Sequence, residues 1–455
     1  MPESTVLPLP LSSSSAEGLR RRARALAARL AGESGEGPPP ARREAPAYPE
    51  HRAVLLYADR DDCLAGLRRL AAGEASPQVV RGVAAGSAQP VLVFPGLGAQ
   101  SPAMGRGLLA HAPVFARRIE ECDRALRPHT GWSLPGVLSG APGTPPPDRM
   151  DVCQPALFAV TLALAALWRS YGVTPAAVVG HSIGEFAAAH ECGALTLAEA
   201  AEIAASWGRA QAALVGTGEM VAVRLPVTEV AVRLRPWPGR LTVAAVNGPR
   251  SVVVSGDREA ADRFLAGLLA DRVGALRVPA GYAAHSPPHM AALRERQLTD
   301  LARITGRAAP TPFYSTVTGR LLDTARLDAA YWYRNLSGPV RFESAVRAAA
   351  VRGHTVFIEV GPHPVLTLGM RQTLETVHER PAVIASAVRS DGSPGRFLRS
   401  VAEAYVAGVP IDWTAAYAGV DVRAIGLPLP VLAPAPAPAP GTPRTGGTPS
   451  PSPTA

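Results

Sequence analysis

Short apolar runs alternate with amphipathic stretches through the middle of the chain. Buried strands are expected at 91–94 (VLVF) and 176–180 (AAVVG), and helices at 113–127, 154–171 and 183–192. The alternation returns near residue 310, with TPFYSTVTG followed by VFIEVGP. Strands that alternate with helices form a mostly parallel sheet with both faces covered. The pattern therefore predicts one large α/β unit over 90–218 and 282–375.

Residues 219–281 break that alternation with a different order of elements. MVAVRL, LTVAAVNG, SVVVSG and ALRVPAG are typical of strands, and PVTEVAVRL and DREAADRFLAGLLADR are typical of helices. The resulting order, βαββαβ, is that of a ferredoxin-like subdomain. Because the α/β pattern continues on both sides, we expect this small subdomain to be an insertion in the large one.

The two ends of the chain differ from its middle in composition. Residues 1–50 are rich in Ser, Pro, Gly and Arg, and we expect them to be partly disordered with one short helix at 15–32. Residues 51–89 predict a small αβ appendage with a strand, a helix and a strand. A connecting segment at 376–427 leads to an Ala-Pro-rich tail, 428–455, which cannot bury a core and is expected to be disordered.

The charge of the chain excludes one class of function. The basic side chains behind the net charge of +9 are all arginines, and only 5% of the residues are aromatic. These arginines are scattered, whereas a nucleic-acid reader gathers basic residues on one element with aromatic ones between them. The chain has no purely apolar stretch of 18 residues and no signal-peptide pattern. We therefore expect a soluble, cytoplasmic protein that binds neither nucleic acid nor membrane.

The cysteines argue against a metal site and against a disulfide framework. No two of them form a CxxC pair, and their spacing suits neither zinc nor a set of bridges. Reduced, buried thiols are expected at Cys63, Cys122, Cys153 and Cys192.

The segment VVGHSIGEFAAAH at 178–190 contains the strongest candidate for a nucleophile. Ser182 stands between Gly180 and Gly184, directly after a predicted strand and directly before a predicted helix. Glycines at these places let the chain turn sharply and project a serine hydroxyl, as in a nucleophile elbow of the α/β-hydrolase type. The backbone N–H groups that follow lie at a helix N-terminus, where partial positive charge stabilises an oxyanion.

A serine nucleophile needs a base, and two histidines compete for that role. His285, in GYAAHSPPHM, follows the last strand of the inserted subdomain, and His289 lies four residues further on. The sequence favours His285 as the base, and His289 remains an alternative. His181 adjoins Ser182 in sequence, so its side chain is expected to point away from the serine hydroxyl. We expect it to support the catalytic residues without contacting the substrate.

Seven motifs, in order and at matching spacing, give the chain a resemblance to a known family. They are FPGLGAQ (94–100), QPALFAV (154–160), GHSIGEFAAAH (180–190), NGPRSVVVSG (247–256), YAAH (282–285), NLSGPVRF (335–342) and EVGPHPVL (359–366). Over about 90–375 the sequence resembles the acyltransferase domain of type I modular polyketide synthases, a family that includes malonyl-CoA:carrier-protein transacylases. The flanking segments at 51–85 and 408–417 are similar to the linkers of such domains.

The resemblance implies roles for individual residues. Ser182 would form an acyl-enzyme, and His285 would act as its general base and then as general acid. The family orients this histidine with a backbone carbonyl, which the match places at Asn335. Backbone N–H groups of Leu97 and Ile183 would form the oxyanion hole. The resemblance also implies that Gln154 lies close to the acyl group.

Two positions depart from the family pattern. Leu97 replaces a glutamine in the glycine-rich turn, which leaves the backbone N–H available. Trp207 replaces the arginine with which extender-unit enzymes grip the free carboxylate of malonyl groups. Arg209 lies about 200° further around the same helix and is a poor substitute. An alternative is that Trp207 is an ordinary core side chain and another residue has taken over the arginine's role.

A dicarboxylic acyl group would bury its carboxylate against the indole without a partner, at a cost of several kcal/mol, or roughly a thousandfold in selectivity. An alkyl group instead gains about 0.8 kcal/mol for each buried CH₂. Small side chains in the segment Tyr282, Ala283 and Ala284 would leave room for a branched chain. The sequence thus predicts a loading-module enzyme that selects a starter unit without a free carboxylate, of the propionyl, isobutyryl, 2-methylbutyryl or acetyl type.

Acyl-CoA would be the donor, and the phosphopantetheine thiol of an acyl carrier protein would be the acceptor. No bound cofactor or metal is expected. The chain has no DSL-type carrier motif, so the carrier and the downstream synthase domains would be separate partners. The alternatives are an extender-unit transferase with a displaced carboxylate clamp, a serine thioesterase or esterase, and a non-catalytic remnant that docks a carrier protein.

Overall fold

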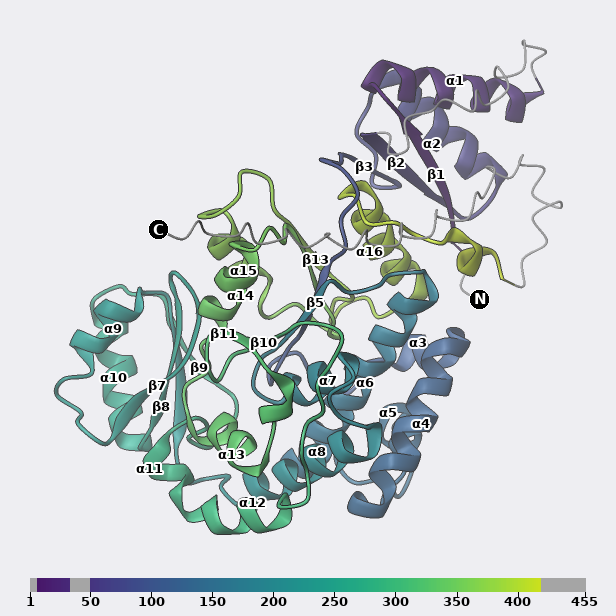
Figure 1. Cartoon of the computed structure of the whole chain (residues 1–455). Coiled ribbons are helices and arrows are strands. Elements are labelled where there is room, and N and C mark those ends of the chain that lie inside the picture. Colours follow the sequence, from purple (N-terminus) through teal and green to yellow (C-terminus); the bar gives the residue numbers. More distant parts are fainter. Residues whose placement is uncertain (1–5, 33–49, 419–455) are drawn as a thin grey trace, which may run out of the picture.

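The computed structural model describes residues 6–32 and 50–418, and Figure 1 shows how they are arranged. Three sheets organise the described residues: an N-terminal sheet of three strands, a central sheet of six and a separate sheet of four. The expected disordered tail at 428–455 lies outside the described residues.

The central sheet is mostly parallel, as predicted. Its strands lie in the order β11-β10-β5-β4-β12-β13, and every neighbouring pair is parallel except β10 and β11. The strands are β4 (Val91–Phe94), β5 (Ala177–Gly180), β10 (Phe313–Ser315), β11 (Arg320–Leu322), β12 (Val356–Glu359) and β13 (Ala382–Ala385). Because β4 and β5 are central neighbours, the segments that follow them, 95–100 and 181–184, emerge side by side at one edge of the sheet.

Helices cover both faces of this sheet, and alternate residues of each strand contact opposite layers. Leu92 and Phe94 of β4 belong to the larger core, whereas Val91 and Val93 belong to a second core. The first layer includes α3 (Arg106–His111), α4 (Pro113–Thr130), α5 (Leu134–Ser139), α6 (Met150–Ser170), α7 (Gly184–Glu191), α8 (Leu197–Ala212), α13 (Ala329–Ser337) and α16 (Pro394–Val406). The second layer includes α14 (Phe342–Ala350) and α15 (Thr367–Leu374). The shorter helices α11 (Pro287–Met290) and α12 (Arg294–Asp300) precede α13 along the chain.

Helix α6 is the only helix in the described part of the chain that is long and apolar enough to cross a membrane. Most of its length is buried against α4 and α8 inside the large subdomain. Its composition is therefore that of a core helix, which all-round burial requires.

The small subdomain has the predicted order βαββαβ. Its elements are β6 (Glu219–Val223), α9 (Val227–Arg233), β7 (Leu241–Gly248), β8 (Ser251–Gly256), α10 (Arg258–Ala270) and β9 (Ala275–Val278). The strands form an antiparallel sheet in the order β7-β8-β6-β9 and share a hydrophobic core of their own. A backbone bridge between Ala245 of β7 and Val340 ties this sheet to the large subdomain.

The N-terminal segment contains a strand that the sequence analysis did not predict. Strand β1 (Leu7–Ser13) pairs antiparallel with β2 (His51–Tyr57), which in turn pairs with β3 (Val79–Val83). The expectation for 1–50, partial disorder with one short helix, did not include this strand. Leucines at alternate positions of β1 are buried, and prolines stand between them, which an edge strand tolerates because it has an unpaired side. Helices α1 (Ala16–Ala31) and α2 (Arg60–Ala72) pack together beside this sheet, and α16 packs on β2 and β3.

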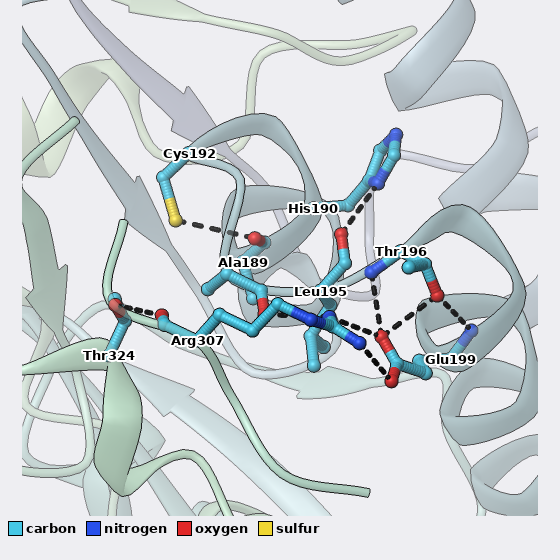
Figure 2. A network of polar contacts seen from close by, with 9 residues as sticks. Ala189, His190, Cys192, Leu195, Thr196, Glu199, Arg307 and Thr324 are labelled. Atoms are coloured by element: carbon cyan, nitrogen blue, oxygen red, sulfur yellow. Dashed lines mark hydrogen bonds and ion pairs between the residues drawn. The ribbon is translucent and has the colours of Figure 1, made fainter. Parts of the chain in front are cut away.

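The start of α8 is fixed by a network of polar contacts, drawn in Figure 2. Thr196 and Glu199 form a reciprocal capping box in which each side chain bonds to the backbone N–H of the other. Both guanidinium Nη atoms of Arg307 donate to the Glu199 carboxylate, each at 2.8 Å. This network anchors the N-terminus of the helix that carries Trp207.

Candidate active site

Ser182 lies on a sharp turn between β5 and α7. Its backbone is left-handed, with φ of 54°, which is unusual for a residue other than glycine. A Cβ atom at Gly180 would lie 2.3 Å from Cα of Glu185, and one at Gly184 would lie 2.1 Å from the carbonyl oxygen of Phe94. Both glycines of the GxSxG motif are therefore required, because the turn packs against its own helix and against the end of β4.

The structure brings Ser182 and His285 together across 103 residues of chain. Oγ of Ser182 lies 2.8 Å from Nε2 of His285, and both side chains are buried. His285 also has a left-handed backbone, with φ of 56°. The competing His289 instead faces Ser286, whose Oγ lies 2.9 Å from its Nδ1. Of the two histidines, His285 is the one placed to take a proton from the serine hydroxyl.

The buried position of His285 controls its charge. The pKa of His285 is lowered to about 4, mainly by burial and further by nearby His181, although hydrogen bonds to the backbone at 335 and 338 act in the opposite direction. The imidazole is therefore neutral at pH 7, which is the form that accepts a proton.

Two backbone carbonyls lie beside the ring of His285, and the predicted one at Asn335 is among them. Nδ1 of the ring lies 3.1 Å from the carbonyl oxygen of Gly338, and the backbone of Asn335 makes a further hydrogen bond to it. The orienting group is therefore the chain turn that spans 335–338, in which Gly338 joins the predicted Asn335. This turn is the C-terminal end of α13, with Gly338 as its C-cap, and it leads into Val340, which pairs with β7. With Nδ1–H donated to a carbonyl, Nε2 is left free to accept from Ser182.

The side chain of Asn335 has a different partner. Its Nδ2 donates to Oε2 of Glu185 at 2.6 Å and to the carbonyl oxygen of Ser182 at 3.4 Å. Glu185 is fully buried and also accepts hydrogen bonds from Thr316 and Tyr331. The sequence analysis did not single out Glu185. The sequence pattern that could have indicated it is a carboxylate three residues after the serine, in a segment of otherwise apolar residues.

The two backbone groups expected to form an oxyanion hole lie on adjoining turns. A Cβ atom at Gly96, the residue before Leu97, would lie 3.3 Å from Cβ of Ser182. Ile183 is the N-cap residue of α7, so its N–H lies at the positive end of that helix. Within the described part of the chain, no hydrogen bond engages the N–H of either Leu97 or Ile183.

His181 points away from the serine hydroxyl, as expected. Its Nε2 lies 2.8 Å from Oδ1 of Asn247 at the end of β7, and its ring packs at 5.5 Å from the ring of Phe342. Burial lowers the pKa of His181, which keeps it neutral beside His285. The contact between His181 and Asn247 links the turn that carries Ser182 to the small subdomain.

Trp207 is fully buried on α8. Its ring meets that of Phe186 edge to face, with centroids 4.8 Å apart, and its Nε1 has no hydrogen-bond partner. Phe186 lies on α7, four residues after Ser182. Arg209 points elsewhere, since its Nη1 donates to the carbonyl oxygen of His129 at 3.0 Å. The expectation that Arg209 does not replace the missing arginine agrees with this geometry.

A buried hydrogen-bond triad lies on the same face of α8 as Trp207, one helical turn further on. Oε1 of Gln211 accepts from the hydroxyl of Tyr282 and from Nε2 of Gln154, and all three side chains are buried. Gln211 was not predicted as a site residue, although its spacing from Trp207 could have indicated it. The triad joins Gln154 of α6 to the segment that ends at His285.

Tyr282 and Ala284 form a small apolar cluster with Ala280. Five partly buried apolar side chains pack against it: Leu97, Met150, Leu214, Met220 and Val278. Leu97 thus adds an apolar side chain where the family pattern has glutamine. Ala283 does not belong to this cluster. Ala283 packs against the backbone at Gly218, because a Cβ atom added to Gly218 would lie 2.7 Å from Cβ of Ala283. That Ala283 lines the acyl pocket stays a prediction.

The remaining candidates are thiols and metal ligands. Cys63, Cys122, Cys153 and Cys192 are all free and buried, as expected. Among residues 6–32 and 50–418, no group of three or more His, Cys, Asp or Glu side chains could hold a metal ion.

Two solved structures have a similar fold. The acyltransferase domain of module 8 of the salinomycin polyketide synthase is 43% identical and superposes with a TM-score of 0.84, covering 90% of this chain and 98% of that one. A loading acyltransferase of the avermectin synthase is 47% identical, with a TM-score of 0.67, and covers 69% of this chain and 99% of that one.

Curated relatives give the same result. Polyketide synthase GfsA of Streptomyces halstedii is 46% identical over 434 residues, which cover 93% of this chain and 6% of GfsA. Erythronolide synthase EryA3 of Saccharopolyspora erythraea is 45% identical over 438 residues, which cover 94% of this chain and 14% of EryA3. The chain thus spans a small part of these relatives. The acyl transferase domain family matches residues 91–410. The chain belongs to the acyl transferase domains of type I modular polyketide synthases.

Proposed function

We propose that this domain loads a starter unit without a free carboxylate onto an acyl carrier protein. Ser182 attacks the thioester of an acyl-CoA, and His285 accepts its proton. His285 then protonates the departing CoA thiolate, which leaves an acyl ester on Ser182. In the second half-reaction the phosphopantetheine thiol of the carrier attacks this ester and regenerates the serine. The N–H groups of Leu97 and Ile183 stabilise the oxyanion in both halves.

The contact of 2.8 Å between Ser182 and His285 on a strained turn carries the transferase mechanism. Preference for an uncharged acyl group is supported by the side chains on α8 and in the apolar cluster of Ala280, Tyr282 and Ala284. Trp207 stands at the arginine position, Arg209 is engaged elsewhere, and Leu97 adds an apolar side chain beside Tyr282. A dicarboxylic group would meet these side chains with an unpaired charge, at a cost of roughly a thousandfold in selectivity.

The relatives support either kind of substrate. The similar avermectin domain is a loading acyltransferase, whereas the salinomycin domain belongs to module 8 of its synthase. The decisive test is therefore chemical. The protein is incubated with acetyl-, propionyl-, isobutyryl-, malonyl- and methylmalonyl-CoA, and adducts are read by intact mass, with Ser182→Ala as the control. We expect adducts from the first three donors. Preferential labelling by malonyl- or methylmalonyl-CoA would show an extender-unit enzyme.

Two variants of Trp207 then test whether this side chain sets the preference among acyl groups. Trp207→Arg should shift labelling toward malonyl-CoA, and Trp207→Phe should keep the preference for uncharged groups. Arg209→Ala is the matched control and should leave the preference unchanged, because that side chain bonds to His129. A change in preference in Arg209→Ala alone would identify Arg209 as a displaced carboxylate clamp.

A carrier protein added to the labelled enzyme separates transfer from hydrolysis. Loss of the adduct to the carrier thiol supports a transferase. Release of free acid at the same rate with and without carrier would indicate a thioesterase.

A further inference from the structure

Glu185 is a buried carboxylate beside the nucleophile that the mechanism above does not use. It lies in the first turn of α7, and its side chain is completely enclosed. Oε1 accepts from the backbone N–H of Thr316 at 2.6 Å and from its hydroxyl at 2.8 Å. Oε2 accepts from the hydroxyl of Tyr331 and from Nδ2 of Asn335, both at 2.6 Å. Four donors thus occupy the lone-pair sites that a carboxylate offers.

Two of these donors lie on α13, the helix that leads into the turn beside His285. Asn335 also reaches the carbonyl oxygen of Ser182, at 3.4 Å. Three residues later, the carbonyl of Gly338 accepts from Nδ1 of His285. The carboxylate therefore connects to the serine through α7 and through Asn335, and to the histidine through the end of α13.

We propose that Glu185 is a positioning residue of the serine–histidine pair: without touching His285, it fixes α13 and thereby the carbonyl that sets the tautomer of the ring. The proposal rests on the mechanism given above. In a triad an acidic side chain bonds directly to the histidine and orients it. Here the acid acts one step further away, through Asn335 and the turn at 335–338.

The four donors explain why an acid is needed at this position. Burial raises the pKa of Glu185, and the hydrogen bonds from Tyr331, Thr316 and Asn335 lower it. A glutamine of the same shape would point its N–H₂ group at donors and leave at least one bond unmade. The expected consequence is a shift of Asn335 and of the carbonyls that follow it.

The central experiment compares Glu185→Gln and Glu185→Asp with the wild type. We expect Glu185→Gln to lower kcat for acyl transfer about 100-fold, as for a displacement of about 1 Å, while KM for acyl-CoA stays nearly unchanged. Glu185→Asp keeps the charge and should recover part of the rate. Asp123→Asn is the matched control, because Asp123 is also a buried acid that accepts a backbone N–H, from Leu134, but it lies on α4.

A second measurement distinguishes positioning from a purely structural role. In protein labelled with ¹⁵N-histidine, the NMR shifts of His285 should report one tautomer with the proton on Nδ1 in the wild type. Glu185→Gln should give a mixture of tautomers. If this variant loses only thermal stability, and keeps both its rate per folded molecule and its single tautomer, the proposal is overturned.

If Glu185→Gln does not fold, Asn335→Ala provides a second test. In this variant Glu185 keeps the hydrogen bonds from Thr316 and Tyr331, so it should fold. The single variant should lower kcat and disturb the tautomer in the same way. Where both fold, the double variant should lose little more than Glu185→Gln alone, since the two residues act through one link. Additive losses would refute that link. Failure of the wild type to form an ester on Ser182 would refute the mechanism itself, independently of Glu185.

Discussion

Substitution of Gly184 by alanine tests whether the close approach of two turns creates the catalytic geometry. A Cβ atom at residue 184 would lie 2.1 Å from the carbonyl oxygen of Phe94 and 2.8 Å from that of Pro95. Both are backbone atoms at the end of β4, so no side chain can rotate to make room. The turn that carries Ser182 and the turn that carries Leu97 must therefore separate.

The size of the movement follows from these distances. Side-chain Cβ atoms essentially never approach within 3.0 Å of another heavy atom, so the contact of 2.1 Å requires a shift of at least 0.9 Å. Overpacking of this kind costs about 1–3 kcal/mol of folding free energy. A displacement of about 1 Å in a catalytic group costs about 100-fold in rate. We therefore expect Gly184→Ala to fold less stably and to acylate about 100-fold more slowly.

Acylation is measured as the rate of adduct formation on Ser182 by intact mass, and stability by thermal unfolding. Gly267→Ala is the control, because an added Cβ at this site in α10 meets nothing within 4 Å. It should leave acylation unchanged and raise stability by up to about 1 kcal/mol. Wild-type acylation in a folded Gly184→Ala variant would show that the spacing of the two turns does not limit the reaction.

Two further predictions concern the thiols and the cap of α8. Burial raises the pKa values of Cys63, Cys122 and Cys153 to about 12 and that of Cys192 to about 11. At pH 8 a thiol reagent should therefore label the native protein slowly and label all four cysteines at once in guanidinium; rapid native labelling would contradict their burial. Arg307 and the cap hydrogen bonds lower the pKa of Glu199 from 4.5 to about 2, so its stabilising contribution is complete above pH 4.5 and is lost as the pH falls toward 2. Glu199→Gln should lower the free energy of unfolding by about 1 kcal/mol at pH 7, and denaturant titrations should show this difference shrinking on acidification. A difference that stays constant with pH would mean that the charge of Glu199 does not contribute.

The regular elements could be predicted because their signals are local. A four-residue apolar run followed by a helical pattern identifies a buried strand such as β4 or β5, and the order βαββαβ identifies the small subdomain. Strand β1 could not be predicted in this way. Its prolines argue against a strand unless the strand lies at an edge, and position within a sheet depends on the partners that the rest of the chain supplies.

The sequence by itself determined the turn around Ser182, since two glycines between a strand and a helix allow few other conformations. It also placed His285 ahead of His289. Only the tertiary structure decided which groups meet across long stretches of chain: the carbonyl of Gly338 beside Nδ1 of His285, and Glu185 beneath Asn335. Hydrogen bonds act over about 3 Å and depend on direction. Sequence spacing therefore names the residues that reach a site, while packing decides which of their atoms touch.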